Sequence, residues 1–131
     1  MMNRKDTPDE SEQEIVHFPN FQVDTQDTPW YQHPEWDGVF LKDLIGGKDT
    51  GGAFSYHLVQ VWKDCRILDH DHATQWEWNR VISGKGVFTF GDAEIPFVPG
   101  RTFVTPPGVR HGIRVYHSDL TLLAMFVPAL V

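Results

Sequence analysis

The sequence predicts an all-β protein, and three observations support that prediction. From Gly38 to Val127 the chain is a series of short runs rich in β-branched and aromatic residues. Gly, Pro, Asp and Asn separate these runs, as they do at turns between strands. No stretch has the 3.6-residue period of a long amphipathic helix. Many short strands of similar length are typical of a β sandwich or a β barrel.

Nine strands are expected, each lying between two turn signals. Glycine pairs at 46–47 and 51–52, Gly-Asp at 91–92 and Pro-Pro-Gly at 106–108 mark the sharpest turns. The expected strands cover residues 38–42, 53–62, 65–70, 77–83, 86–90, 94–98, 101–105, 109–115 and 120–127.

The last expected strand, residues 120–127, is apolar on both of its faces. A strand in a barrel wall normally alternates apolar and polar side chains, so a second layer should cover the outer face of this one. One candidate cover is the chain's own amino-terminal segment, with Trp30, Trp36, Val39 and Leu41. The other is a second subunit in a homodimer with a twofold axis. The residues alone leave both covers open.

Length and composition predict one folded domain preceded by a tail. A chain of 131 residues, 40% of them hydrophobic, is enough for one packed core. We expect the barrel domain to occupy residues 26–131. Residues 1–25 lack an apolar period and are rich in acidic side chains, which predicts a flexible acidic tail. Its acidic residues include Asp6, Asp9, Glu10, Glu12 and Glu14.

The charge and the single cysteine argue against several classes of protein. A net charge of −7 argues against DNA or RNA as a partner, because nucleic acids are bound by clustered lysines and arginines. Cys65 is the only cysteine, and no apolar run in the first thirty residues resembles a signal peptide. No run approaches the roughly 18 apolar residues of a membrane-spanning helix. We therefore expect a cytoplasmic protein with no membrane and no nucleic-acid partner.

His70, His72 and Glu77 form the first part of a candidate site. Alternate residues of a strand point to the same face, so the two histidines project together. Glu77 begins the next expected strand and can face the same interior, with Asn79 on the same face behind it. The same alternation turns Trp78 outward, where it would contribute to packing or to a subunit interface.

His111 completes the candidate site as a metal site. It follows the Pro-Pro-Gly turn, and parity places it with Ile113 and Val115 on the apolar face of its strand. Three imidazoles and a carboxylate would be costly to bury unpaired, whereas one divalent cation satisfies all four. This ligand set suits a first-row transition metal such as Fe, Mn, Ni, Co or Zn and leaves coordination positions open.

The two segments that carry these side chains resemble the two sequence motifs of the cupin superfamily. Residues 70–84 match the first motif with the pattern HxHx4Ex6G, and residues 100–111 match the second with the pattern Gx5PxGx2H. The resemblance implies a double-stranded β-helix, or jelly roll, in which the four side chains named above hold the metal. Two positions depart from the motifs. Asp64 stands where a glycine usually precedes the first motif, and Val115 stands where an asparagine often ends the second.

Four further residues are candidates for the pocket around the metal. By parity Arg66 faces the same way as His70 and would bind a substrate carboxylate, unless it forms a salt bridge at the rim. Asn79 would orient water or substrate, unless it makes a structural hydrogen bond. Tyr56 and His57 are neighbours on one strand, so only one of them can face the pocket and act there as an acid or base.

We therefore expect a metal-dependent enzyme of dioxygenase, lyase or isomerase type that acts on a small polar or carboxylate-bearing molecule. The alternative is a sensor that binds a metal or a small molecule without turnover. In both cases the partner is a small molecule. Because one fold hosts many reactions, the choice depends on the geometry of the site.

Overall fold

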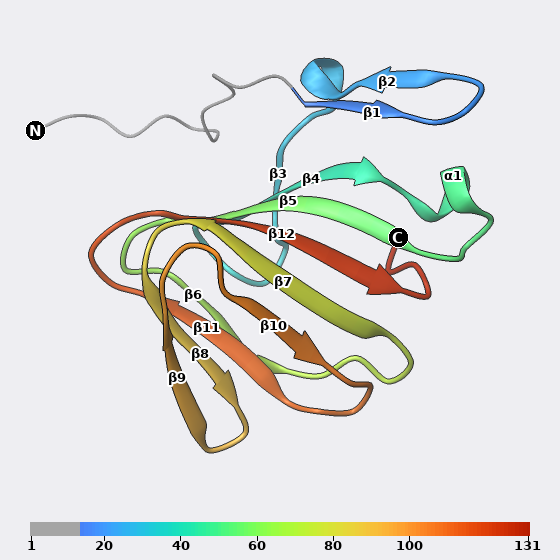
Figure 1. The fold of residues 1–131 in the computed structure, drawn as a ribbon. Helices are drawn as coiled ribbons and strands as arrows, with labels where there is room; N and C mark the ends of the chain where they lie inside the picture. The colour runs from blue at the N-terminus through green and yellow to red at the C-terminus, as the bar shows by residue number, and fades with distance from the viewer. Residues whose placement is uncertain (1–13) are drawn as a thin grey trace, which may run out of the picture.

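Two antiparallel β sheets face each other around one hydrophobic core (Figure 1). The structure is a computed structural model that describes residues 14–131. The larger sheet has six strands in the order β10-β7-β12-β5-β4-β3, and the smaller has four in the order β6-β11-β8-β9. The prediction of an all-β jelly roll is confirmed.

Strands make up most of the described residues, and the two helices are single turns. The strands are β1 (Ile15–His17), β2 (Gln22–Asp24), β3 (Tyr31–Gln32), β4 (Val39–Ile45), β5 (Ser55–Val61), β6 (Arg66–His70), β7 (Trp76–Ser83), β8 (Gly86–Phe90), β9 (Ala93–Phe97), β10 (Thr102–Thr105), β11 (His111–Val115) and β12 (Leu120–Val127). The helices are η1 (Thr25–Asp27) and α1 (Gly47–Thr50). Among residues 14–131 no helix has the length and apolar character needed to cross a bilayer.

The chain passes between the two sheets, and two of these crossings meet at one end of the barrel. The first runs from β6 in the smaller sheet to β7 in the larger one, and the second runs from β10 back to β11. Thr105 at the end of β10 pairs with Glu77, and His111 at the start of β11 pairs with His70. The amide of Gly108 also donates a hydrogen bond to the carbonyl of His72, at 2.8 Å. The two motif segments are therefore held side by side.

Strand β12 lies in the middle of the larger sheet, between β5 and β7. Its side chains alternate in burial as the pleat requires, although the sequence is apolar on both faces. The inward-facing residues Leu120, Leu122, Ala124 and Phe126 are at most 5% exposed. The outward-facing residues are only half-buried. The core of the barrel is therefore built from one face of β12, and its other face lies on the outside of the sheet.

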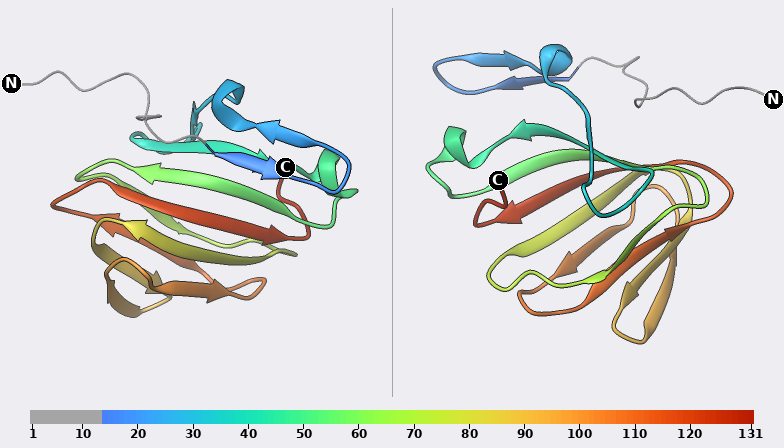
Figure 2. Two further views of the ribbon diagram at one scale, coloured as in Figure 1. Left: turned by 45° about the horizontal axis from the view of Figure 1, so that its top comes forward. Right: turned by 180° about the vertical axis from the view of Figure 1, so that it is seen from behind.

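The amino-terminal part of the described chain forms a hairpin. Strands β1 and β2 pair with each other, and the Thr25 hydroxyl donates a hydrogen bond to the Glu14 carbonyl at 2.6 Å. Figure 2 shows the hairpin beside β4, on the outside of the barrel. A hairpin thus occupies residues 15–24, for which a tail is expected from composition. Residues 1–13 of the expected tail lie outside the described residues.

The amino-terminal segment covers part of the outer face of the larger sheet, but with fewer residues than the sequence suggested. Trp30 lies against the outward side of β4, where the ammonium of Lys42 is 5.9 Å from its ring. Val39 instead belongs to the core, and Trp36 and Leu41 pack against that core and line a cavity. The expectation that these three residues cover the outer face is wrong, because the alternation of β4 turns Val39 and Leu41 inward.

Candidate metal centre

The two crossings bring the four expected ligands together. One ligand atom from each of His70, His72, Glu77 and His111 lies within 4.8 Å of those of the other three. His70 ends β6, His72 follows in the connection, Glu77 lies in β7 and His111 begins β11. The ring centroids of His70 and His111 are 4.4 Å apart, and those of His70 and His72 are 4.9 Å apart. The sequence prediction that these side chains share one site agrees with this geometry.

Backbone carbonyls set the orientation of two of the imidazole rings. Nδ1 of His70 lies 2.8 Å from the carbonyl oxygen of Leu68, and Nδ1 of His111 lies 3.0 Å from that of Val109. A carbonyl oxygen only accepts hydrogen bonds, so Nδ1 carries the proton in both rings. The neutral form of each ring then presents the lone pair of Nε2 to the cluster, which is the state that a metal requires.

Glu77 is the electrostatic centre of the cluster. Its Oε1 lies 2.9 Å from Nε2 of His111 and 3.1 Å from Nε2 of His72. Burial alone would raise the pKa of Glu77, but its contacts with His111, His72 and Asn79 lower that pKa to about 2. Burial also lowers the pKa of His111, and the bond to Glu77 outweighs it, so the pKa of His111 lies above its ordinary value. Without a metal, the two residues pair as carboxylate and imidazolium at pH values below the pKa of His111.

The donor set fits a divalent cation. Nε2 of His72 is buried and has no hydrogen-bond partner among residues 14–131, although it lies within ion-pair distance of Glu77. Oε1 of Glu77 and the Nε2 atoms of His111 and His72 lie close enough together to bind one ion. A cation would satisfy the orphaned nitrogen and replace the shared proton.

The cluster lies in the wall of a cavity of about 230 Å³. This volume is below the range of about 300 to 1,000 Å³ that drug-sized ligands occupy, so the cavity suits a small molecule. Most of the remaining wall is apolar and includes Trp36, Leu41, Val59, Leu122, Phe126 and Leu130.

Arg66 lies outside this cavity, because a register shift interrupts the alternation of β6. His111 pairs with His70 and Ile113 with Ile67, so β6 advances three residues where β11 advances two. Ile67 and His70 therefore both line the cavity, and Arg66 is exposed. The arginine lines a separate hollow of about 580 Å³ on the smaller sheet. The expectation from parity that Arg66 faces the metal pocket is wrong.

Gly112 is part of the same irregularity. A Cβ atom at this position would lie 2.9 Å from the carbonyl oxygen of Ile67 and would also contact the carboxylate of Asp69. Only a glycine allows β11 to approach β6 this closely. The close approach brings His111 alongside His70.

Asn79 faces the site and forms a hydrogen bond with the candidate ligand Glu77. Its Nδ2 donates a hydrogen bond to Oε2 of Glu77 at 2.9 Å, which leaves Oε1 to the histidines. Asn79 is 2% exposed and lines the cavity wall. Of the two roles expected from the sequence, the structural hydrogen bond is the one that the geometry shows.

Tyr56 and His57 both belong to the described part of the chain, and neither lines the cavity. His57 faces inward and is fully buried, with Nδ1 2.8 Å from Asp43 and Nε2 2.9 Å from the hydroxyl of Ser55. Tyr56 lies on the outer face of the sheet, where burial, followed by the charge of Glu14, raises the pKa of its hydroxyl. The expectation that one of the two faces the pocket is wrong.

His57 is linked to the cavity through one aromatic ring. The ring of Phe126 lies edge-on to His57 at 5.5 Å and to His72 at 5.2 Å, measured between centroids. The hydroxyl of Ser55 also accepts a hydrogen bond from the amide of Leu130, at 3.0 Å. His57 therefore packs against a residue of the cavity wall and supports it without lining the cavity.

Four residues of the cavity wall come from segments outside the barrel strands, and the sequence prediction did not place them there. His33, Glu35 and Trp36 come from the segment before β4, and Leu130 comes from the segment after β12. The rings of His33 and Trp36 stack at 3.9 Å with an interplanar angle of 13°, and Trp36 lies 4.9 Å from His70. These residues lie far from both motifs in the sequence, and no local pattern marks them.

Solved structures of low sequence identity share this fold. A predicted oxalate decarboxylase from Thermotoga maritima aligns with a TM-score of 0.73 at 20% identity, over 81% of this chain and 97% of that one. KdgF from Halomonas sp. aligns at 0.68 with 19% identity, over 79% and 90%. The polyketide cyclase RemF from Streptomyces resistomycificus aligns at 0.70 with 18% identity, over 80% and 77%. At these identities the likeness establishes the fold only.

A comparison with curated proteins finds no match. The family model described as the cupin domain matches residues 57–127, which is more than half of the chain. The matched segment contains all four clustered side chains and both sequence motifs. The resemblance noted from the motifs is thus confirmed, and the chain belongs to the cupin family.

Proposed function

We propose that this cupin is a metal-dependent enzyme that acts on a small molecule in the 230 Å³ cavity. Its cofactor would be one divalent first-row transition metal, bound by His70, His72, Glu77 and His111. The observation that supports this proposal is the convergence of four ligand atoms within 4.8 Å, on one wall of a largely apolar cavity. Three imidazoles and one carboxylate leave coordination positions for a substrate, as in catalytic rather than structural sites.

A divalent ion held there would supply Lewis acidity toward an oxygen atom of the bound molecule. The residues of the chain supply the rest. Asn79 holds the Glu77 carboxylate in place, and the carbonyls of Leu68 and Val109 hold two of the imidazoles. Such supporting contacts fix the ligands before the metal binds and lower the cost of assembling the site.

A sensor without turnover is the competing function. Catalysis would require acids or bases that reach the cavity and are not needed as ligands. Among the described residues of the wall, His33 and Glu35 meet that requirement. Their presence favours the enzyme over the sensor.

The metal content of the purified protein tests the proposal. The protein would be prepared without chelators or a polyhistidine tag and analysed by inductively coupled plasma mass spectrometry. We expect about one equivalent of a transition metal in the wild type and a loss of roughly tenfold or more in Glu77→Gln and His72→Ala. His117→Ala is a matched control, because His117 is exposed and lies outside the cluster.

Equal metal content in all four proteins would overturn the proposed metal site. The identity of the metal then directs the search for turnover. Iron would lead to measurements of O₂ consumption, whereas manganese, nickel, cobalt or zinc would lead to screens for lyase and isomerase activity.

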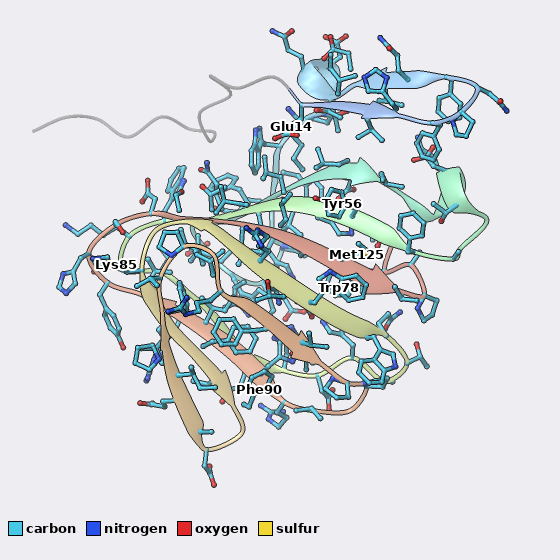
Figure 3. The ribbon with its side chains drawn as sticks, viewed as in Figure 1. Glu14, Tyr56, Trp78, Lys85, Phe90 and Met125 are labelled. Carbon is cyan, nitrogen blue, oxygen red and sulfur yellow. The ribbon has the colours of Figure 1, made fainter. Side chains whose placement is uncertain are left out.

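We also propose that the protein is a homodimer. Tyr56, Met125 and Trp78 lie on the neighbouring strands β5, β12 and β7 of the larger sheet (Figure 3). Met125 pairs with both of the others, so the three side chains form one row, which Val104 extends on β10. Val104 is 49% exposed. A second copy of the chain would cover this row through a twofold interface.

A further inference from the structure

The charged and polar groups of the cavity wall limit which molecules fit there. Among residues 14–131 no lysine or arginine lines the cavity. Arg66, the expected cation, lines the separate hollow on the smaller sheet. The charged side chains that do line the cavity are the carboxylates Glu35 and Glu77. The two carboxylates already offset the charge of a divalent ion held by the cluster. Since no cationic side chain lines this apolar cavity, a bound anion would leave it with a net negative charge, which is costly to bury.

His33 is held in one orientation on this wall. The amide of Glu35 donates a hydrogen bond to its Nδ1 at 3.1 Å. The stack on Trp36, at 3.9 Å between centroids, fixes the plane of the ring. Trp36 in turn lies against the ligand residue His70, at 4.9 Å. The ring of Trp36 thus lies between the imidazole of His33 and the candidate metal ligand His70.

The bond at Nδ1 decides which tautomer His33 adopts. Since Nδ1 accepts a proton donor, a neutral ring must carry its own hydrogen on Nε2. Burial, which outweighs the nearby Glu35 carboxylate, also lowers the pKa of His33 and so favours the neutral ring. No hydrogen bond from residues 14–131 occupies Nε2. His33 therefore presents one hydrogen-bond donor that the protein itself does not use.

The carboxyl-terminal segment contributes a fixed apolar part of the wall. The amide of Leu130 donates to Ser55, and the amide of Gly47 donates to the carbonyl of Val131 at 2.6 Å. The amide of Ala129 donates to the carbonyl of Gly52 at 3.1 Å. These bonds hold the Leu130 side chain on the cavity, where it adds apolar surface for a ligand to bury.

From this arrangement we propose that the cavity binds a neutral, largely apolar molecule that carries a carbonyl, enol or phenol oxygen, and that His33 donates its Nε2 hydrogen to an oxygen of that molecule. This inference rests on the proposed metal site and adds a substrate class to it. His33 then acts as a specificity-determining residue. The inference departs from the carboxylate-bearing substrate expected from the sequence, because that expectation relied on Arg66.

Two probes that differ in one group test the charge preference. In 2′-hydroxyacetophenone an aromatic ring carries a phenol and a neutral acetyl group, and in salicylate a carboxylate replaces the acetyl group. Both place a second oxygen donor next to the phenol oxygen, a ketone oxygen in one and a carboxylate oxygen in the other. Isothermal titration calorimetry on the zinc-loaded protein would measure the two dissociation constants. We expect the neutral probe to bind more tightly. Tighter binding of salicylate, or no binding of the neutral probe, would overturn the inference.

His33→Phe tests the assignment of the donor. Phenylalanine retains the stack on Trp36 and removes the Nε2 hydrogen, so affinity for the neutral probe should fall roughly three- to tenfold. His117→Phe is the matched control and should bind as the wild type does. Unchanged affinity in His33→Phe at wild-type zinc content would overturn the role of His33.

Zinc content separates failure of the inference from failure of the proposed function. Absence of zinc from the reconstituted wild type would refute the metal site and the inference that rests on it. A zinc-loaded wild type that prefers salicylate would refute the inference alone. Should His33→Phe fail to fold, the preference of the wild type between the two probes still decides the charge of the ligand.

Discussion

Glu77 and His111 show how one residue pair supports two states of the site. When His111 of the metal-free protein is protonated, the carboxylate and the imidazolium form an ion pair at 2.9 Å, and both residues are largely buried. A metal would take the place of the proton between them, since it requires the neutral form of the histidine. The four side chains are thus already close together without a metal, and the proposed metal-bound state would differ from the metal-free state in the protonation of His111.

The pH dependence of the metal-free protein follows from these pKa shifts. The pKa of His111 is raised on folding. Its contribution to the stability of the fold is therefore complete below about pH 6.5 and is lost as the pH rises through the pKa of the folded state. The pKa of Glu77 is lowered from 4.5 to about 2, so its contribution is present above pH 4.5 and is lost as the pH falls toward 2. The pair should stabilise the fold most between about pH 4.5 and 6.5.

Thermal unfolding in the presence of a chelator would measure this effect. The difference in Tm between the metal-free wild type and Glu77→Gln should shrink as the pH rises from 6 to 9. Metal affinity should change in the opposite direction and increase over the same range, because binding displaces a proton. A difference in Tm that stays constant across this range would contradict the ion pair.

At the scale of the elements, the turn before β6 illustrates how the chain tolerates a departure from its family's motif. Asp64 stands where the motif usually has glycine, and it has a φ of 65°, in the left-handed region. Aspartate enters this region at lower cost than most residues, though at a higher cost than glycine. Its amide still donates to the carbonyl of Val115 at 3.1 Å, so the turn connects to β11 despite the substitution.

Asp64→Gly should therefore stabilise the protein by about 0.5 to 1 kcal/mol, since it removes the strain of the left-handed conformation. For a chain of this size the expected rise in Tm is about 2 to 4 °C. Differential scanning calorimetry would measure it, with Asp64→Asn as a control that should be close to neutral. A lower Tm for Asp64→Gly would mean that the Asp64 carboxylate stabilises the fold by more than the left-handed backbone conformation destabilises it.

At the scale of the whole molecule, the outer face of the larger sheet has two kinds of surroundings. Near β4 the chain's own amino-terminal segment covers it, with Trp30 against Lys42. Across β5, β12 and β7 the side chains of Tyr56, Met125 and Trp78 are only partly buried. The two covers expected from the sequence are thus compatible, one for each part of the sheet.

Trp78→Arg tests the proposed dimer. A charge in the middle of the apolar row should weaken a twofold interface, because each subunit would bury the arginine against its copy. Light scattering should give about twice 15.1 kDa for the wild type and close to 15.1 kDa for the variant. Val98→Arg is the matched control, because Val98 is 39% exposed and follows β9 of the other sheet. A monomeric wild type would refute the dimer.

Local patterns in the sequence determined the fold class and the identity of the clustered side chains. The alternation of β7 correctly placed Glu77 and Asn79 inward, because side chains of an uninterrupted strand alternate without reference to the rest of the molecule. The motif spacing identified all four candidate ligands for the same reason. Each motif spans one turn between two strands, and its geometry depends on short-range chain direction.

Only the tertiary structure decided which other residues reach the cavity. Arg66 is excluded by an irregularity in the pairing of β6 with β11, which depends on residues more than forty positions away. His33 and Leu130 enter from segments before and after the barrel strands that carry the motifs. Their positions depend on long-range packing, which no local period encodes. Which residues line the cavity therefore follows from how distant segments meet, whereas the four candidate metal ligands follow from the sequence itself.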